Sequence, residues 1–149
     1  MRYFEVVKDE YRKVPNVDIK LPVRATKSSV AYDFYSPVDI TIQPHQSSII
    51  WTDVKAIFET NEALLLNVRS SMGKQPIMLA NTQGWVEADY ANNPDNDGNI
   101  GLRLFNLGET PYEIHMGDRI GQGMFINYLV TDDDDSTTIR QGGFGSTGN

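Results

Sequence analysis

NIGLRLF, residues 99–105, is a short stretch in which apolar residues alternate with others. Ile100, Leu102 and Leu104 share one side of an extended chain, while Arg103 lies on the other. Similar apolar runs recur at 3–7, 38–42, 48–58, 63–68, 76–80, 111–115 and 120–130. Because Pro, Gly, Asn, Asp or Ser separate these runs, the sequence predicts many short strands joined by turns, as in an all-β barrel or sandwich.

Helical patterning is weak throughout the sequence. No window of eleven or more residues carries a convincing helical stripe, and the best helix candidate is a single turn after Arg69, Ser70 and Ser71. At 149 residues the chain fits one domain with one hydrophobic core.

The composition excludes several kinds of chemistry. The absence of cysteine excludes disulfides, thiol catalysis and cysteine-based zinc sites, and with only two histidines any metal is expected to be held by oxygen. The net charge of −7 argues against a broad basic face, so we expect no DNA or RNA binding. An anionic ligand would therefore need a locally basic site or a divalent cation.

The first ten residues, MRYFEVVKDE, carry charges at positions 2, 5, 8, 9 and 10 and lack the apolar core of a signal peptide. No stretch approaches the ~18 apolar residues of a membrane span. The sequence therefore predicts a soluble cytoplasmic protein without membrane contact.

Two polar stretches divide the chain. ANNPDNDG (91–98) is longer than a hairpin turn requires, and the acidic run DDDD (132–135) is typical of a solvated linker. We expect a β-barrel domain at 1–131, a linker at 132–139 and a C-terminal arm at 140–149. The arm, RQGGFGSTGN, holds four of the twelve glycines, and without a ligand it is typical of a frayed tail.

Five clusters combine glycine, hydroxyl groups, carboxylates and arginine in ways that a core does not need. They are AYDFYSP (31–37), VRSSMGK (68–74), NTQGWVEADY (81–90), GDRIGQG (117–123) and GGFGSTG (142–148). Together and in this order they resemble the five motifs of the homotrimeric dUTPase family of bacterial or phage type. GGFGSTG and GDRIGQG are the most specific of these matches.

The resemblance implies a fold, an assembly and a reaction. The fold is a jelly-roll-like β-barrel that forms a homotrimer with exchanged arms, each folding over a nucleotide in a neighbouring subunit's site. The reaction converts dUTP and water to dUMP and pyrophosphate, with Mg²⁺ held by the triphosphate.

The first, second and fourth motifs imply a phosphate-binding group of residues. Arginine offers a rigid donor fork to phosphoryl oxygens, and serine offers a hydroxyl. By resemblance Asp33 lies close to the phosphates and contacts the Mg²⁺ through water. The residues expected at the phosphates are Arg69, Ser70, Ser71 and Gln122.

The third motif implies the reacting centre. In a strand Glu87 and Asp89 would face the same side, with Ala88 turned away. By resemblance Glu87 activates the attacking water, and Tyr90 lies under the deoxyribose and excludes a 2′-hydroxyl. Asn81 helps to read uracil, and Asp89 is a further expected substrate-binding residue.

The fifth motif implies a cover for the nucleotide. Its glycines allow positive φ angles, so that successive N–H groups can form an anion-binding nest, with hydroxyls beside it. By resemblance Phe144 stacks on the base, while Arg140, Gly145, Ser146 and Thr147 lie near the γ-phosphate.

Three positions depart from the family pattern. Glu87 stands where the family has aspartate, Ala31 replaces a usual glycine, and Arg140 lies one residue nearer to Phe144 than is common. A carboxylate displaced by over an ångström would cost about 10²-fold in rate where geometry is strict.

Two other functions remain open at this point. A dUTP-binding regulatory protein with weak turnover would fit the substitution at Glu87. A dCTP deaminase shares the Arg-Ser-Ser motif, but it depends on a glutamate in a later strand, where LRLFN (102–106) has no acid. A regulatory partner docked on the 91–98 insertion is a further hypothesis.

Overall fold

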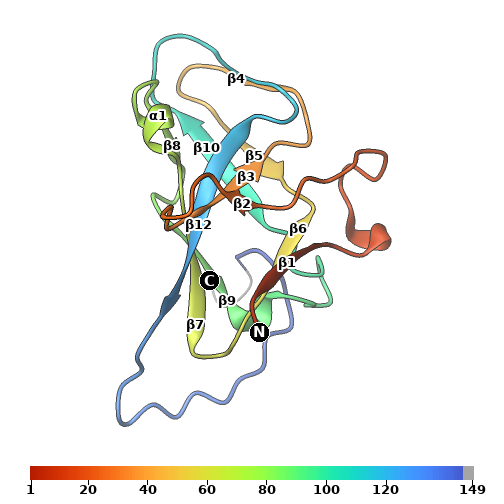
Figure 1. The fold of residues 1–149 in the computed structure, drawn as a ribbon, viewed down its shortest axis with the longest axis vertical. Helices are drawn as coiled ribbons and strands as arrows, with labels where there is room; N and C mark the ends of the chain where they lie inside the picture. Colours follow the sequence, from red (N-terminus) through yellow and green to blue (C-terminus); the bar gives the residue numbers. More distant parts are fainter. Residues whose placement is uncertain (146–149) are drawn as a thin grey trace.

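The structure is a computed structural model that describes residues 1–145, and most of its regular elements are short strands (Figure 1). The strands are β1 (Tyr3–Val6), β2 (Val23–Arg24), β3 (Tyr32–Tyr35), β4 (Ile40–Ile42), β5 (Ser47–Trp51), β6 (Val54–Ile57), β7 (Glu62–Asn67), β8 (Ile77–Leu79), β9 (Gly84–Glu87), β10 (Gly101–Asn106), β11 (Tyr112–Ile114) and β12 (Arg119–Asn127). The helical pieces are α1 (Ser70–Gly73) and the 3-10 turns η1 (Asp9–Tyr11) and η2 (Ala88–Tyr90). The expected all-β class is confirmed.

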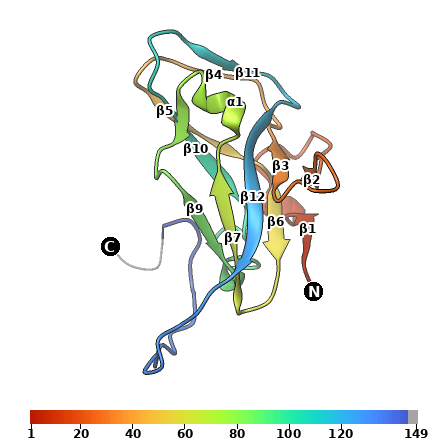
Figure 2. The same ribbon diagram turned by 60° about the vertical axis from the view of Figure 1, so that its left-hand side comes forward.

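The strands form two main sheets that share one core. The larger sheet has the order β2-β3-β12-β7-β9, and a three-stranded sheet has the order β5-β10-β8, with antiparallel pairing throughout. Phe34, Leu64 and Ile120 of the larger sheet belong to the same buried cluster as Leu102 and Leu104 of β10. Figure 2 shows β7 and β12 side by side, with α1 above the upper end of β7.

The alternation in NIGLRLF places apolar side chains in the core, as predicted. Leu102 and Leu104 are buried in β10, while Arg103 between them is exposed. The predicted run at 48–58 is interrupted, because Asp53 takes a positive φ of 57° and separates β5 from β6. The last strand stops at Asn127, so the run at 120–130 was predicted too long.

The glycines of GDRIGQG let β12 approach the core closely. A Cβ on Gly123 would lie 2.9 Å from Cδ1 of Leu64 and 3.0 Å from Cε2 of Phe34. The pairing of β12 with β3 also shifts between Arg119 and Gly121, which is a β-bulge. Bulges re-aim side chains beside functional sites, and this one lies next to Asp33.

The 91–98 insertion is folded against the N-terminal segment by buried charges. Asp97 is 1% exposed and accepts hydrogen bonds from Nζ of Lys55 at 2.9 Å and from the backbone N–H of Lys8 at 2.8 Å. Lys55 is 4% exposed and also donates to Oδ1 of Asn92 at 2.7 Å. The insertion is therefore an ordered loop in which the buried Asp97 is paired with Lys55. Within residues 1–145, no helix is long and apolar enough to cross a membrane.

Replacement of Asp53 with alanine should strongly destabilise the fold. Its buried carboxylate accepts hydrogen bonds from the N–H groups of Lys13 (2.8 Å) and Val14 (3.0 Å) and from the amide of Asn99 (2.9 Å). Nε of Arg12, whose side chain is 13% exposed, lies 3.5 Å from Oδ2 of Asp53, and removal of one member of such a buried ion pair costs about 3–5 kcal/mol. We expect a loss of that size in urea unfolding at fixed protein concentration. Asp39→Ala, which removes one exposed acceptor, should cost about 1 kcal/mol; an equal loss in both variants would contradict this reading.

Candidate functional site

Two cavities lie at different ends of the larger sheet. The β9 pocket, of about 300 Å³, is lined by Leu66, Leu79, Asn81, Gly84, Trp85, Val86, Glu87, Tyr90, Ile100, Gly101, Leu102, Arg103, Arg140, Gly143, Phe144 and Gly145. The Asp33 pocket, of about 250 Å³, is lined by Ala25, Ser29, Val30, Ala31, Asp33, Arg69, Ser70 and Gln122. No lining residue is common to both.

Alternation along β9 places Glu87 at the pocket. Gly84 and Val86 are buried, whereas Trp85 and Glu87 are exposed on the other face. The strand ends at Glu87 and the chain turns into η2, so the expectation that Asp89 continues the strand was wrong. The turn forms because the hydroxyl of Tyr90 donates to the carbonyl of Asn99 at 2.6 Å, which draws the ring inward. Of the two carboxylates, Glu87 lines the pocket and Asp89 lies outside its lining.

Tyr90 forms one wall of the β9 pocket and is only 8% exposed. Burial raises the pKa of its hydroxyl above the ordinary value, and the hydrogen bond from Asn96 opposes that shift. The hydroxyl therefore stays protonated at neutral pH and keeps its hydrogen bond to Asn99.

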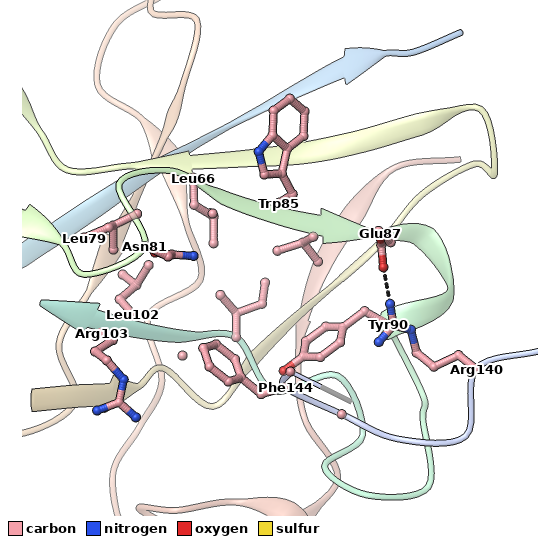
Figure 3. Close-up of a pocket in the computed structure, with 16 residues that line it drawn as sticks. Leu66, Leu79, Asn81, Trp85, Glu87, Tyr90, Leu102, Arg103, Arg140 and Phe144 are labelled. Atoms are coloured by element: carbon pink, nitrogen blue, oxygen red, sulfur yellow. Dashed lines mark hydrogen bonds and ion pairs between the residues drawn. The ribbon is translucent and has the colours of Figure 1, made fainter. Parts of the chain in front are cut away.

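The first residues of the arm lie across the β9 pocket (Figure 3). Nε of Arg140 donates to Asp89 at 2.8 Å, and its Nη2 pairs with Glu87. The ring of Phe144 meets Trp51 edge-on at 5.8 Å between centroids. One cation thus joins both carboxylates of the third motif.

Two features of the arm can be described in the single chain without a ligand. Of its glycines within the described chain, Gly145 has a positive φ, 71°, whereas Gly142 and Gly143 do not. Segment 140–145 lies on the chain's own pocket, because the exposed stretch 128–139 turns back along the same body. Ser146 and Thr147 lie outside the described residues.

The Asp33 pocket brings the first, second and fourth motifs together. Asp33 is 5% exposed, with Oδ1 3.1 Å from Nε of Arg69 and Oδ2 3.5 Å from Nη1 of Arg119. Gln122 pairs with Asp33 across β3 and β12 and lines the cavity. Arg69 is oriented by Asp33 with its Nη1 toward the hydroxyl of Ser71 at 3.4 Å. The result is an arginine fork beside hydroxyl and amide groups, which suits phosphoryl oxygens.

Glu87 of the β9 pocket and Arg69 of the Asp33 pocket lie far apart along β7. Glu87 pairs with Ala63 near the start of β7, whereas Arg69 follows the far end of that strand in extended conformation. At ~3.3 Å per residue, the six steps from Ala63 to Arg69 span roughly 20 Å. The Cα atoms of Glu87 and Arg69 are therefore separated by about the length of β7.

Several lining residues were not among the sequence-based candidates. Arg103 and Trp85 line the β9 pocket, and Ser29 lines the Asp33 pocket. Arg103 had a visible signal, because it is the charged residue on the outer face of an otherwise apolar strand. Ser29 had no comparable signal, since hydroxyl residues are common in loops.

The carboxylates do not form a metal cage by themselves. Within residues 1–145, no three His, Cys, Asp or Glu side chains are grouped to hold a metal ion. Asp33 is an oxygen donor of the kind that Mg²⁺ prefers, and it lines the pocket that contains Arg69.

A family model and individual relatives both match this chain and indicate the same family. The family model described as dUTPase matches residues 17–148. The deoxyuridine 5'-triphosphate nucleotidohydrolase of Lactococcus lactis is 36% identical over 99% of this chain and 98% of that protein. The protein of the same name from Haemophilus influenzae is 31% identical over 88% of this chain and 89% of that protein.

Solved structures agree with the sequence matches. The crystal structure of dUTPase from Streptococcus mutans is similar with a TM-score of 0.76 and 31% identity, over 87% of this chain and 98% of that one. The dUTPase of Staphylococcus aureus phage phi11 shares the fold, with a TM-score of 0.72 and 16% identity over 93% of this chain and 97% of that one. A mutant of that phage protein coordinates a structural Mg(II) ion.

Proposed function

The chain belongs to the dUTPase family, and from this premise we propose that it hydrolyses dUTP to dUMP and pyrophosphate. The observation that carries the proposal is the β9 pocket, where a carboxylate, a buried tyrosine and an asparagine face one cavity under an aromatic cover. The test is turnover of dUTP with both products measured, beside dCTP and UTP. Release of deaminated product from dCTP, without dUMP from dUTP, would overturn it.

The β9 pocket suits the nucleoside half of the substrate. We assign Asn81 to the base, Phe144 to a stack above it and Tyr90 to the floor under the sugar. Glu87 would then accept a proton from the water that attacks the α-phosphorus. Its position at the pocket, which Asp89 does not share, supports this role.

The Asp33 pocket suits the triphosphate. Arg69, Ser70 and Gln122 would donate hydrogen bonds to phosphoryl oxygens, and Ser71 would support Arg69 through its hydroxyl. Asp33 would hold Arg69 in place and contact Mg²⁺ through water. The metal, held by the triphosphate, would neutralise charge on the transferring group.

The arm would complete the charge balance around the phosphates. Arg140 is paired with Glu87 and Asp89 in the nucleotide-free chain. With dUTP bound, its guanidinium and the glycine-rich segment after it, with Ser146 and Thr147, would turn to the phosphates. The arginine would thereby release Glu87 to act as a base.

We further propose that the protein is a homotrimer in which the β9 pocket of one subunit meets the Asp33 pocket of another. The roughly 20 Å between Glu87 and Arg69 supports this assembly, since a nucleotide must touch both groups at once. The arm of a neighbouring subunit would then occupy the place that the chain's own arm takes here.

A trimer of about 50 kDa is expected in light scattering, three times the 16.8 kDa chain. Complementation gives the sharper measurement. A mixture of Glu87→Gln and Arg69→Ala proteins, unfolded and refolded together, should regain dUTP turnover that neither protein has alone, because some sites would combine two intact halves. An active 16.8 kDa monomer, or a mixture without recovery, would contradict the shared site.

A further inference from the structure

The 91–98 loop is held rigidly beside the β9 pocket. Its far end is fixed by the buried pair of Asp97 and Lys55. Within the loop, Oδ1 of Asn93 accepts hydrogen bonds from the N–H groups of Asp95 (2.9 Å) and Asn96 (3.0 Å). The loop is thus braced from outside and from within, and its side chains hold defined positions.

Asn96 uses both of its side-chain polar atoms to join this loop to Tyr90. Its Nδ2 donates to the hydroxyl of Tyr90 at 2.9 Å, while its Oδ1 accepts from Nδ2 of Asn93 at 2.7 Å and from the N–H of Gly98 at 3.0 Å. The amide therefore cannot rotate without breaking three hydrogen bonds. Through Asn96, the loop fixes the ring that forms the pocket wall.

The same amide is the surface on which the arm lies. Gly143 is buried, and a Cβ at this position would lie 2.7 Å from Nδ2 and 2.9 Å from Oδ1 of Asn96. Its N–H donates to Oδ2 of Asp95 at 3.3 Å. Because the φ of Gly143 is not positive, the lack of a side chain is required by this contact rather than by the backbone.

We propose that Asn96 is a positioning residue that couples the sugar site to closure of the arm. It holds Tyr90 from one side and receives Gly143 on the other, so a displaced ring would also displace the arm. The proposal rests on the function proposed above, and it gives the insertion a role in specificity for the deoxyribose. In a trimer the contact would form between loop and arm whichever subunit supplies the arm.

Asn96→Ala should lower kcat/KM for dUTP roughly tenfold, the equivalent of about one hydrogen bond. It should also lower the preference for dUTP over UTP, because Tyr90 loses its lateral support. Gly143→Ala should lower kcat/KM by a similar factor and should also lower that preference, because its methyl group would displace the Asn96 Nδ2 that donates to Tyr90. Asn16→Ala, at an exposed loop position, is the control and should stay within about twofold of wild type.

The double variant is the decisive measurement. If the two effects were independent, they would multiply to a loss of roughly 100-fold in kcat/KM. In the double variant, however, removal of the Asn96 amide creates room for the new methyl group of Gly143→Ala. We expect the double variant to lose only about tenfold. Multiplicative losses, or an unchanged preference for dUTP in Asn96→Ala, would overturn the coupling.

Two further measurements keep this test separate from the proposed function. If the wild-type protein does not turn over dUTP, the proposed function is wrong. The two single variants and the double variant are then compared by their Kd for a non-hydrolysable dUTP analogue. If Asn96→Ala does not fold, Asn96→Asp replaces it, because Asp keeps the shape but cannot donate to Tyr90. Retention of wild-type preference by a folded Asn96→Asp protein would likewise overturn the proposal.

Discussion

Removal of residues 140–149 is expected to lower kcat/KM for dUTP by on the order of 10³-fold or more, the range seen when an arginine that stabilises a transferring phosphoryl group is lost. The truncation removes Arg140 and Phe144, which line the β9 pocket, and none of the described arm residues 140–145 belongs to the hydrophobic core cluster. Circular dichroism and light scattering should therefore show an unchanged fold and assembly.

The stability of the truncated protein should also change little. Arg140, whose side chain is 7% exposed, pairs with Glu87 and Asp89, whose side chains are 61% and 59% exposed. Because truncation removes the arginine itself and leaves two exposed carboxylates in water, we expect a loss of about 1 kcal/mol for each pair. Within the full-length protein, Arg140→Ala should act mainly on kcat and Phe144→Ala mainly on KM. A truncated protein with nearly full kcat/KM would mean that the arm is a tail without a catalytic role.

The strands could be predicted because their signal is local. Alternation in residues 99–105 decides which side chains of β10 face the core, whatever the rest of the chain does. The turn at Ala88–Tyr90 could not be read in this way, since it depends on a hydrogen bond from Tyr90 to Asn99. A strand pattern that continues in sequence can thus be ended by one tertiary contact.

The composition of the site was easier to predict than its geometry. The motif residues fall into two groups, at the β9 pocket and at the Asp33 pocket, but no sequence pattern indicates that Glu87 and Arg69 lie roughly 20 Å apart along β7. The role proposed for Asn96 was hidden for a similar reason. A polar turn cluster resembles any surface loop until the partners of its side chains are known.

Replacement of Glu87 with glutamine is expected to lower kcat by 10²–10⁴-fold, the loss typical of a positioned general base. The affinity for a non-hydrolysable dUTP analogue with Mg²⁺ should change much less, because base, sugar and phosphates are contacted by other residues. Asp89→Asn is the matched control, since it removes the other carboxylate that pairs with Arg140. It should affect KM more than kcat; an equal fall of kcat in both variants would mean that the loss comes from a loosened arm.

Glu87→Asp restores the residue that the family carries at this position, so it tests how the pocket has adapted to the longer side chain. Glu87 ends β9, and its carboxylate reaches outward to Arg140 from a strand whose register is fixed by pairing with Ala63. If the surrounding hairpin suits glutamate, the shorter side chain will fall about an ångström short of the water and kcat will drop by about 10²-fold. If kcat rises instead, pairing with Arg140 keeps the Glu87 carboxylate away from the attacking water. The natural protein would then be one that binds dUTP and hydrolyses it slowly. Wild-type turnover in Glu87→Gln would exclude Glu87 as the base and direct attention to Asp89, the other carboxylate within reach of Arg140.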